Sequence, residues 1–156
     1  LEILSLSSVQ ELAGDKEWIQ LDQVLEQILD QYKVLAQSRA LTIDNQIPDK
    51  AVYMDPAILK LVLSNVISNA VKHSDAGGEI QLRLEEEGTH LAVENTSQEM
   101  VETAEMPMTA SRQKKEGGLG LFVVQHLLDH EELAYQFDKT AMGLRFRMEL
   151  PKAPQE

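Results

Sequence analysis

Segments in which apolar and polar residues alternate place the strongest constraint on the fold of this chain. In residues 79–85 (EIQLRLE) every second side chain is apolar, and residues 144–150 (LRFRMEL) repeat the pattern with charged residues between. A period of two puts the apolar side chains on one face of a strand, so these segments predict a sheet with one buried face. Further strands are predicted at 41–47, 51–54, 90–95 and 133–138.

Helical patterns lie between the predicted strands. Apolar residues recur at intervals of three and four over 21–38, where the stripe includes Leu35, over 56–73 and over 119–130. Residues 13–18 (AGDKEW) interrupt the pattern and indicate a linker. Three helices and about five or six strands most simply form an α+β fold, a two-layer α/β sandwich with the helices on one face of a mixed sheet of about five strands.

Composition excludes several kinds of partner. The 156 residues carry a formal net charge of −12, so nucleic acid is not an expected partner, and neither is direct contact with an anionic membrane. The chain has no cysteine, which excludes disulfides and thiolate metal sites. Hydrophobic residues make up 43%, which is typical of a globular domain.

The helix predicted at 56–73 carries a polar stripe beside its apolar one. Asn65, Asn69 and Lys72 follow at intervals of four and three, which places them on one helical face. An amide carbonyl is a hard oxygen ligand suited to Mg²⁺, which usually takes few protein ligands together with phosphate oxygens and water. A lysine one turn later supplies positive charge for phosphate. An ordinary solvated helix face would show the same stripe.

Asn95 is the second candidate. A period of two places it on the inward side of the strand predicted at 90–95, where the strand ends. Its amide could pair with the amino group and ring nitrogen of adenine, as asparagine does when it reads DNA bases. It could equally cap the following loop.

A glycine-rich stretch and a basic cluster come next along the chain. Glycines before a helix, as in residues 117–120 (GGLG), let backbone N–H groups approach phosphates, although a flexible helix entry has the same composition. Arg112, Lys114 and Lys115 could form a mobile lid over phosphates or an ordinary solvated run of charge.

Taken in this order, the segments resemble the ATP-binding catalytic domain of sensor histidine kinases, in the superfamily that also holds gyrase, the Hsp90 chaperone and the MutL repair protein. LSNVISNAVKHS (63–74) closely matches the family's N box. GGLGLFVVQHLL (117–128) matches its second glycine box, and the resemblance covers about residues 20–151. It implies the Bergerat-type ATP-binding fold.

The resemblance also implies a division of the chain. Residues 1–14 would be the end of a dimerisation helix and its linker. Residues 15–156 would be the ATP-binding catalytic domain, with a lid at 96–117. The full-length protein would be a homodimer, and this piece would be the cytoplasmic domain of a membrane-bound sensor.

Site residues carry over one by one. Asn69 would bind Mg²⁺, while Asn65 and Lys72 would support and contact the phosphates of ATP, and these three would form the catalytic group. His73 stands where the family has an aromatic residue near the nucleotide, and Asn95 stands at the family's adenine-binding aspartate. The remaining nucleotide-binding positions implied are Lys115, Gly117, Gly118, Leu119, Gly120 and Leu121.

One departure from the family pattern, and one difference from other members of the superfamily, bear on function. Residues 95–99 (NTSQE) lack the glycines of the first glycine box, which leaves open a degenerate domain used only for protein contacts. An anti-sigma-factor serine kinase is a further alternative. Asn65 stands where gyrase-like ATPases carry a glutamate as general base, and an amide cannot take a proton from water.

The expected activity is therefore that of a protein histidine kinase, incomplete without its phosphoacceptor domain. The γ-phosphoryl group of Mg·ATP would pass to a histidine on the adjoining dimerisation domain of the same protein, and a response regulator would then receive it. His130, in HEE (130–132), superficially resembles an acceptor but falls at the end of a predicted helix.

Overall fold

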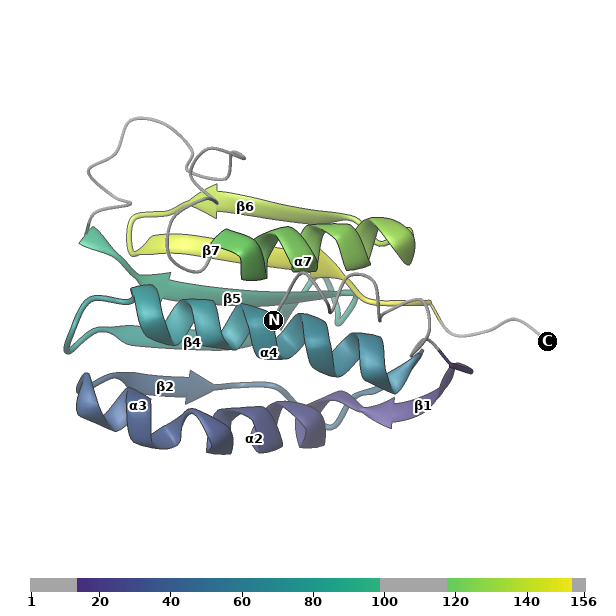
Figure 1. Cartoon of the computed structure of the whole chain (residues 1–156), viewed down its shortest axis with the longest axis horizontal. Helices are drawn as coiled ribbons and strands as arrows, with labels where there is room; N and C mark the ends of the chain where they lie inside the picture. The colour runs from purple at the N-terminus through teal and green to yellow at the C-terminus, as the bar shows by residue number, and fades with distance from the viewer. Residues whose placement is uncertain (1–13, 99–117, 153–156) are drawn as a thin grey trace.

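The computed structural model describes residues 14–98 and 118–152. Within these ranges a layer of helices covers one face of a sheet (Figure 1). The sheet has five strands in the order β2-β4-β5-β7-β6, and β2 runs parallel to β4 while the other pairs are antiparallel. The predicted α+β sandwich with a mixed sheet is confirmed. The strands are β2 (Thr42–Asn45), β4 (Glu79–Glu85), β5 (His90–Thr96), β6 (Tyr135–Lys139) and β7 (Gly143–Glu149).

The longest helix, α4 (Pro56–His73), lies between α2 (Leu21–Gln31) and α7 (Gly118–His130) in the helical layer (Figure 1). Asp55 caps its first turn, because one carboxylate oxygen accepts a hydrogen bond from the Ala57 N–H at 2.9 Å. Its apolar stripe forms the centre of the core. The buried members are Ile58, Leu59, Val62, Leu63, Val66, Ile67, Ala70 and Val71.

Two expectations about the first third of the chain were wrong. The single helix predicted at 21–38 is broken at Tyr32, so α2 is followed by a separate short helix, α3 (Lys33–Ser38), and Leu35 is 37% exposed. The end of the predicted linker, 17–18, already belongs to a strand, β1 (Glu17–Gln20), which pairs with β3 (Ala51–Met54) in a second, two-stranded sheet. Ring contact between Trp18 and Tyr53, with centroids 5.4 Å apart, holds this pair together.

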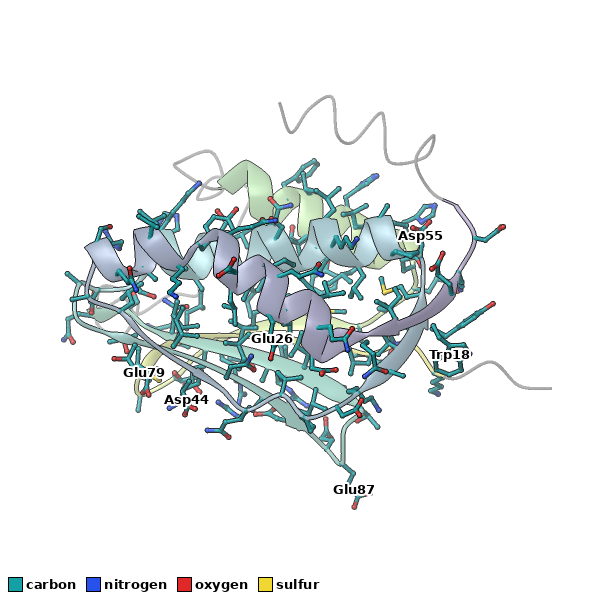
Figure 2. The ribbon with its side chains drawn as sticks, turned by 90° about the horizontal axis from the view of Figure 1, so that it is seen from below. Trp18, Glu26, Asp44, Asp55, Glu79 and Glu87 are labelled. Atoms are coloured by element: carbon teal, nitrogen blue, oxygen red, sulfur yellow. The ribbon has the colours of Figure 1, made fainter. Side chains whose placement is uncertain are left out.

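The outer face of the five-stranded sheet carries charged side chains. Figure 2 shows Asp44 and Glu79 on the side of the sheet away from the helices. Arginines on β4 and β7 pair with carboxylates there, as Arg83 does with Glu94 at 3.1 Å. The sheet therefore has one apolar face under the helices and one ionic face. None of the helices in the described ranges is long and apolar enough to cross a membrane.

Candidate functional site

Asn95 lies on the inner face of β5 near the end of the strand. The register places it between Ile80 of β4 and Leu144 of β7, both buried. Its side chain is 5% exposed and has no hydrogen-bond partner within residues 14–98 and 118–152. Buried amides are nearly always paired. This one is therefore available to a ligand.

A small cavity opens beside Asn95, between the helices and the sheet. Its volume is about 10 Å³, which is room for about one water molecule. Asn69 of α4 lines the same cavity, so the structure brings together two of the amides singled out from the sequence. The other walls are apolar and come from three strands and two helices. They are Val66, Ala70, Val93, Leu121, Phe137, Leu144 and Phe146.

The rest of the polar stripe on α4 does not line this cavity. Asn65 is half-buried one turn before Asn69, and its Nδ2 donates to the Leu61 carbonyl at 2.7 Å. That bond engages the amide nitrogen and leaves Oδ1 available as an acceptor. Lys72 and His73 are exposed on the last turn of the helix.

Backbone and side-chain hydrogen bonds join the end of α4 to the end of β5. The N–H of Asp75 donates to the Thr96 carbonyl at 3.0 Å, and the N–H of Gln98 donates to the Asp75 carboxylate at 2.7 Å. Arg39 donates to the carbonyl of Ser74, the residue that ends α4. These bonds fix the positions of the two cavity amides relative to each other.

Gly143, the first residue of β7, lies directly against the backbone at the end of β5. A Cβ atom at this position would lie 2.3 Å from the Asn95 carbonyl oxygen and 2.4 Å from the Ser97 nitrogen, so only glycine fits. Gly143 was not singled out from the sequence as part of the site. The available signal was a glycine directly before an alternating strand, which often marks a close backbone approach.

The glycine-rich stretch is described only in part. Gly118, Leu119 and Gly120 are the first residues of α7, and Leu121 is buried against the cavity. Lys115, Gly117 and residues 99–117 of the expected lid lie outside the described residues. The roles assigned to all of these positions remain predictions.

A metal at this site would depend on amide, water and phosphate oxygens. Within the described ranges, no group of three or more His, Asp or Glu side chains could hold a metal ion. Asn69 is half-buried at the cavity, and its amide has no hydrogen-bond partner in the described residues. Its carbonyl oxygen fits Mg²⁺, which commonly takes one or two protein ligands and completes its shell with phosphate and water.

Known proteins share the sequence pattern and the fold of this chain. The family model described as histidine kinase-, DNA gyrase B- and HSP90-like ATPase matches residues 54–154. A sensor histidine protein kinase of Streptococcus pneumoniae, HK06, is 32% identical over 158 residues, which are 96% of this chain and 35% of that protein. The sensor protein VanSB of Enterococcus faecalis is 30% identical over 164 residues, covering 96% and 37%. The chain thus spans about a third of the length of these relatives.

Solved structures show the same fold. The catalytic domain of the histidine kinase ThkA aligns with a TM-score of 0.72 at 20% identity, covering 91% of this chain and all of that one. Full-length ShkA in complex with AMPPNP aligns with a TM-score of 0.71 at 20% identity, covering 96% of this chain and 34% of that one. With the family model matching well over half of its residues, the chain belongs to the histidine kinase-, DNA gyrase B- and HSP90-like ATPase family.

Proposed function

We propose that this chain is the ATP-binding catalytic domain of a sensor histidine kinase. It transfers the γ-phosphoryl group of Mg·ATP to a histidine on an adjoining dimerisation domain of the same protein, from which a response regulator receives it. The observation that carries the proposal is the buried, unpaired amide of Asn95, which shares an otherwise apolar cavity with Asn69.

The lining of the cavity suits a flat heteroaromatic base, and the cavity would have to widen to admit one, because its volume of about 10 Å³ holds about one water molecule. Its apolar walls, such as Val66, Val93 and Phe137, would cover the faces of a ring, while one amide would meet its polar edge. Binding an adenine would give Asn95 the hydrogen bonds that the described chain does not supply. Such polar groups fix the orientation of a ligand in an otherwise apolar site.

The phosphates belong on the α4 side of the site. Asn69 would hold Mg²⁺ through its carbonyl oxygen, and the exposed ammonium group of Lys72 would meet phosphate as a mobile positive charge. Bound Mg²⁺ would neutralise negative charge on the phosphate oxygens. Phosphoryl transfer needs mainly positioning and charge stabilisation from the protein.

Transfer fits this site better than hydrolysis. Asn65 keeps its Nδ2 on the Leu61 carbonyl, and a neutral amide cannot accept a proton from water near pH 7. Among the histidines of this chain, His73 and His130 are exposed at the ends of α4 and α7. We place the acceptor histidine on the dimerisation domain of a homodimeric, membrane-bound sensor, with this domain in the cytoplasm.

Calorimetric titration of the chain with a non-hydrolysable ATP analogue, with and without Mg²⁺, tests the proposal. The parent should bind more tightly with Mg²⁺, and Asn69→Ala should lose that difference, by about 10- to 100-fold in affinity. Ser68→Ala, on the same helix, is the matched control and should behave like the parent. Equal Mg²⁺ dependence in Asn69→Ala and the parent would refute the metal role.

A separate labelling experiment tests the transfer step. With radiolabelled Mg·ATP and the dimerisation helices of the parent protein, the label should appear on a histidine of those helices as an acid-labile, base-stable product. The chain alone should stay unlabelled. Self-labelling of the chain that disappears in His130→Ala would place the acceptor within it and contradict this part of the proposal.

A further inference from the structure

Nothing in the described structure fixes which way the Asn95 amide is turned. Its oxygen and nitrogen have no hydrogen-bond partner in residues 14–98 or 118–152. The neighbouring cavity walls, such as Val66, Ala70 and Val93, are apolar and cannot distinguish the two ends of an amide. The last torsion of an asparagine side chain is soft and has two nearly equivalent orientations. The side chain can therefore present either its oxygen or its nitrogen to a ligand.

Asn69 is the other amide in the cavity, and it does not remove this freedom. Its own side chain also has no partner within the described ranges, so it can turn as well. Neither residue imposes a fixed donor or acceptor on the other. The hydrogen-bond pattern of the pocket is thus set by the bound ligand.

Purines fall into two classes at the edge that such an amide would read. Adenine offers an amino donor at its 6-position and an acceptor at N1. Hypoxanthine and guanine offer the reverse, a carbonyl acceptor at the 6-position and a donor at N1. An amide matches the first class in one orientation and the second after a half turn, because it carries one acceptor and one pair of donors.

A carboxylate at the same place would behave differently. Ionised aspartate has only acceptors, so an oxygen placed at the 6-position pairs with an amino group there but meets a carbonyl oxygen with like charge, and a 6-oxo purine could then be held only through its N1–H. We propose that Asn95 makes this pocket accept both 6-amino and 6-oxo purine nucleotides. The inference rests on the proposed nucleotide-binding function and adds its base selectivity.

Competition binding tests the inference with the chain as it is. A fluorescent ATP analogue is displaced by ATP or by inosine triphosphate, each with Mg²⁺. Inosine triphosphate is chosen because it carries the 6-oxo group without the additional 2-amino group of guanine. The measured quantity is the ratio of the two dissociation constants, compared between the parent, Asn95→Asp and Glu94→Gln.

The parent should bind the two nucleotides within about tenfold of each other, and Asn95→Asp should raise the preference for ATP at least tenfold, because an unpaired buried group costs about that factor or more. Glu94→Gln, which changes one charge on the other face of β5, should keep the parent's ratio. A preference for ATP above tenfold in the parent, or a ratio that Asn95→Asp raises less than tenfold, would overturn the inference alone. Failure of both nucleotides to bind would overturn the proposed function as well.

Discussion

Glu94 and Asn95 are consecutive residues of β5, and both are buried, yet their side chains lie on opposite faces of the sheet and only one of them has a partner. Glu94 faces the outer side of the sheet at 9% exposure and pairs with Arg83 at 3.1 Å. Asn95 faces the helices at 5% exposure and has no side-chain partner in the described residues. Burial of a polar group is costly unless a hydrogen bond compensates it. The fold meets this cost for Glu94, whereas the amide of Asn95 still reaches solvent and can take its hydrogen bonds from water or a ligand.

The outer face extends the pattern set by Glu94. Arg147 lies 3.0 Å from Glu85, and Arg145 lies 3.1 Å from Asp138. Each of these arginines is about a quarter exposed, so the pairs are partly screened by solvent and each contributes little to stability. These pairs bring opposite charges together on the outer face, although the Nε of Arg145 is buried there without a hydrogen-bond partner among the described residues. On the inner face, Asn69 and Asn95 beside the cavity have no side-chain partner in the described residues.

Gly143→Ala should have the largest effect, because it breaks the contact that holds the Asn95 end of β5. The new methyl group would lie 2.3 Å from the Asn95 carbonyl oxygen, so the strand must move. We expect a loss of about 3 kcal/mol in the free energy of unfolding, measured by urea denaturation, together with weaker nucleotide binding.

Gly77→Ala is the matched control for this substitution. Its φ is +78° and an added Cβ would meet nothing within 4 Å, so it carries the backbone strain without the clash. We expect it to cost about 1 kcal/mol and to leave nucleotide affinity unchanged. Equal effects of the two substitutions would mean that the close approach of Gly143 does not position the site.

Asn95→Leu and Glu94→Gln together test whether the inner face of β5 serves nucleotide binding and the outer face serves stability. Asn95→Leu should reduce nucleotide affinity about 100-fold or more, because the base loses its polar partner, while the free energy of unfolding stays level or rises. Glu94→Gln should do the reverse, lowering the free energy of unfolding by about 1 kcal/mol with unchanged affinity, because Arg83 loses its charged partner. Calorimetry and urea denaturation give both quantities.

The two faces of β5 would not differ in this way if both variants lost both nucleotide affinity and free energy of unfolding. The same would follow if Asn95→Leu lowered the free energy of unfolding as much as Glu94→Gln does. Either outcome would make Asn95 an ordinary structural residue.

Tyr135 offers the smallest and most specific test, because it is a polar group on the inner face that does have a partner. Burial raises the pKa of its phenol above 10.0, and the charge of Asp129 and a hydrogen bond to it raise it further. The folded protein holds this proton more tightly than the unfolded chain. The resulting stability is present below pH 10 and is lost as the pH rises through the folded pKa.

Urea denaturation of the parent and of Tyr135→Phe between pH 9 and about 11.5 measures this contribution. The parent should lose stability more steeply than the variant over that range. Parallel curves would mean that the interaction with Asp129 does not persist in solution.

Much of the fold was predictable because its signal is local. The period of two in 79–85 and 144–150 fixed which side chains of β4 and β7 face the helices. The same period correctly placed Asn95 on the inner side of β5. The apolar stripe of α4 and its Asp-Pro start likewise required no knowledge of distant residues.

The features that were not predicted depend on contacts between residues that are distant in the sequence. The apolar pattern runs on through Tyr32, so nothing local marked the break between α2 and α3. The strand β1 has no alternation and exists because β3 pairs with it. Asn65 and Asn69 have the same residue type and similar surroundings in sequence, but only Asn69 lines the cavity. The distinction lies in what the facing strands place opposite each residue.

The order of strands in the main sheet also affects how copies of the domain meet. In the described chain its free edges are β2, with four residues, and β6, with five. The first carries Asp44, and the second carries Asp138 and Lys139. An incoming strand would find few backbone groups to pair with and would bring its own chain against charged side chains. Short, charged edges together with a formal net charge of −12 therefore protect the domain against edge-to-edge aggregation.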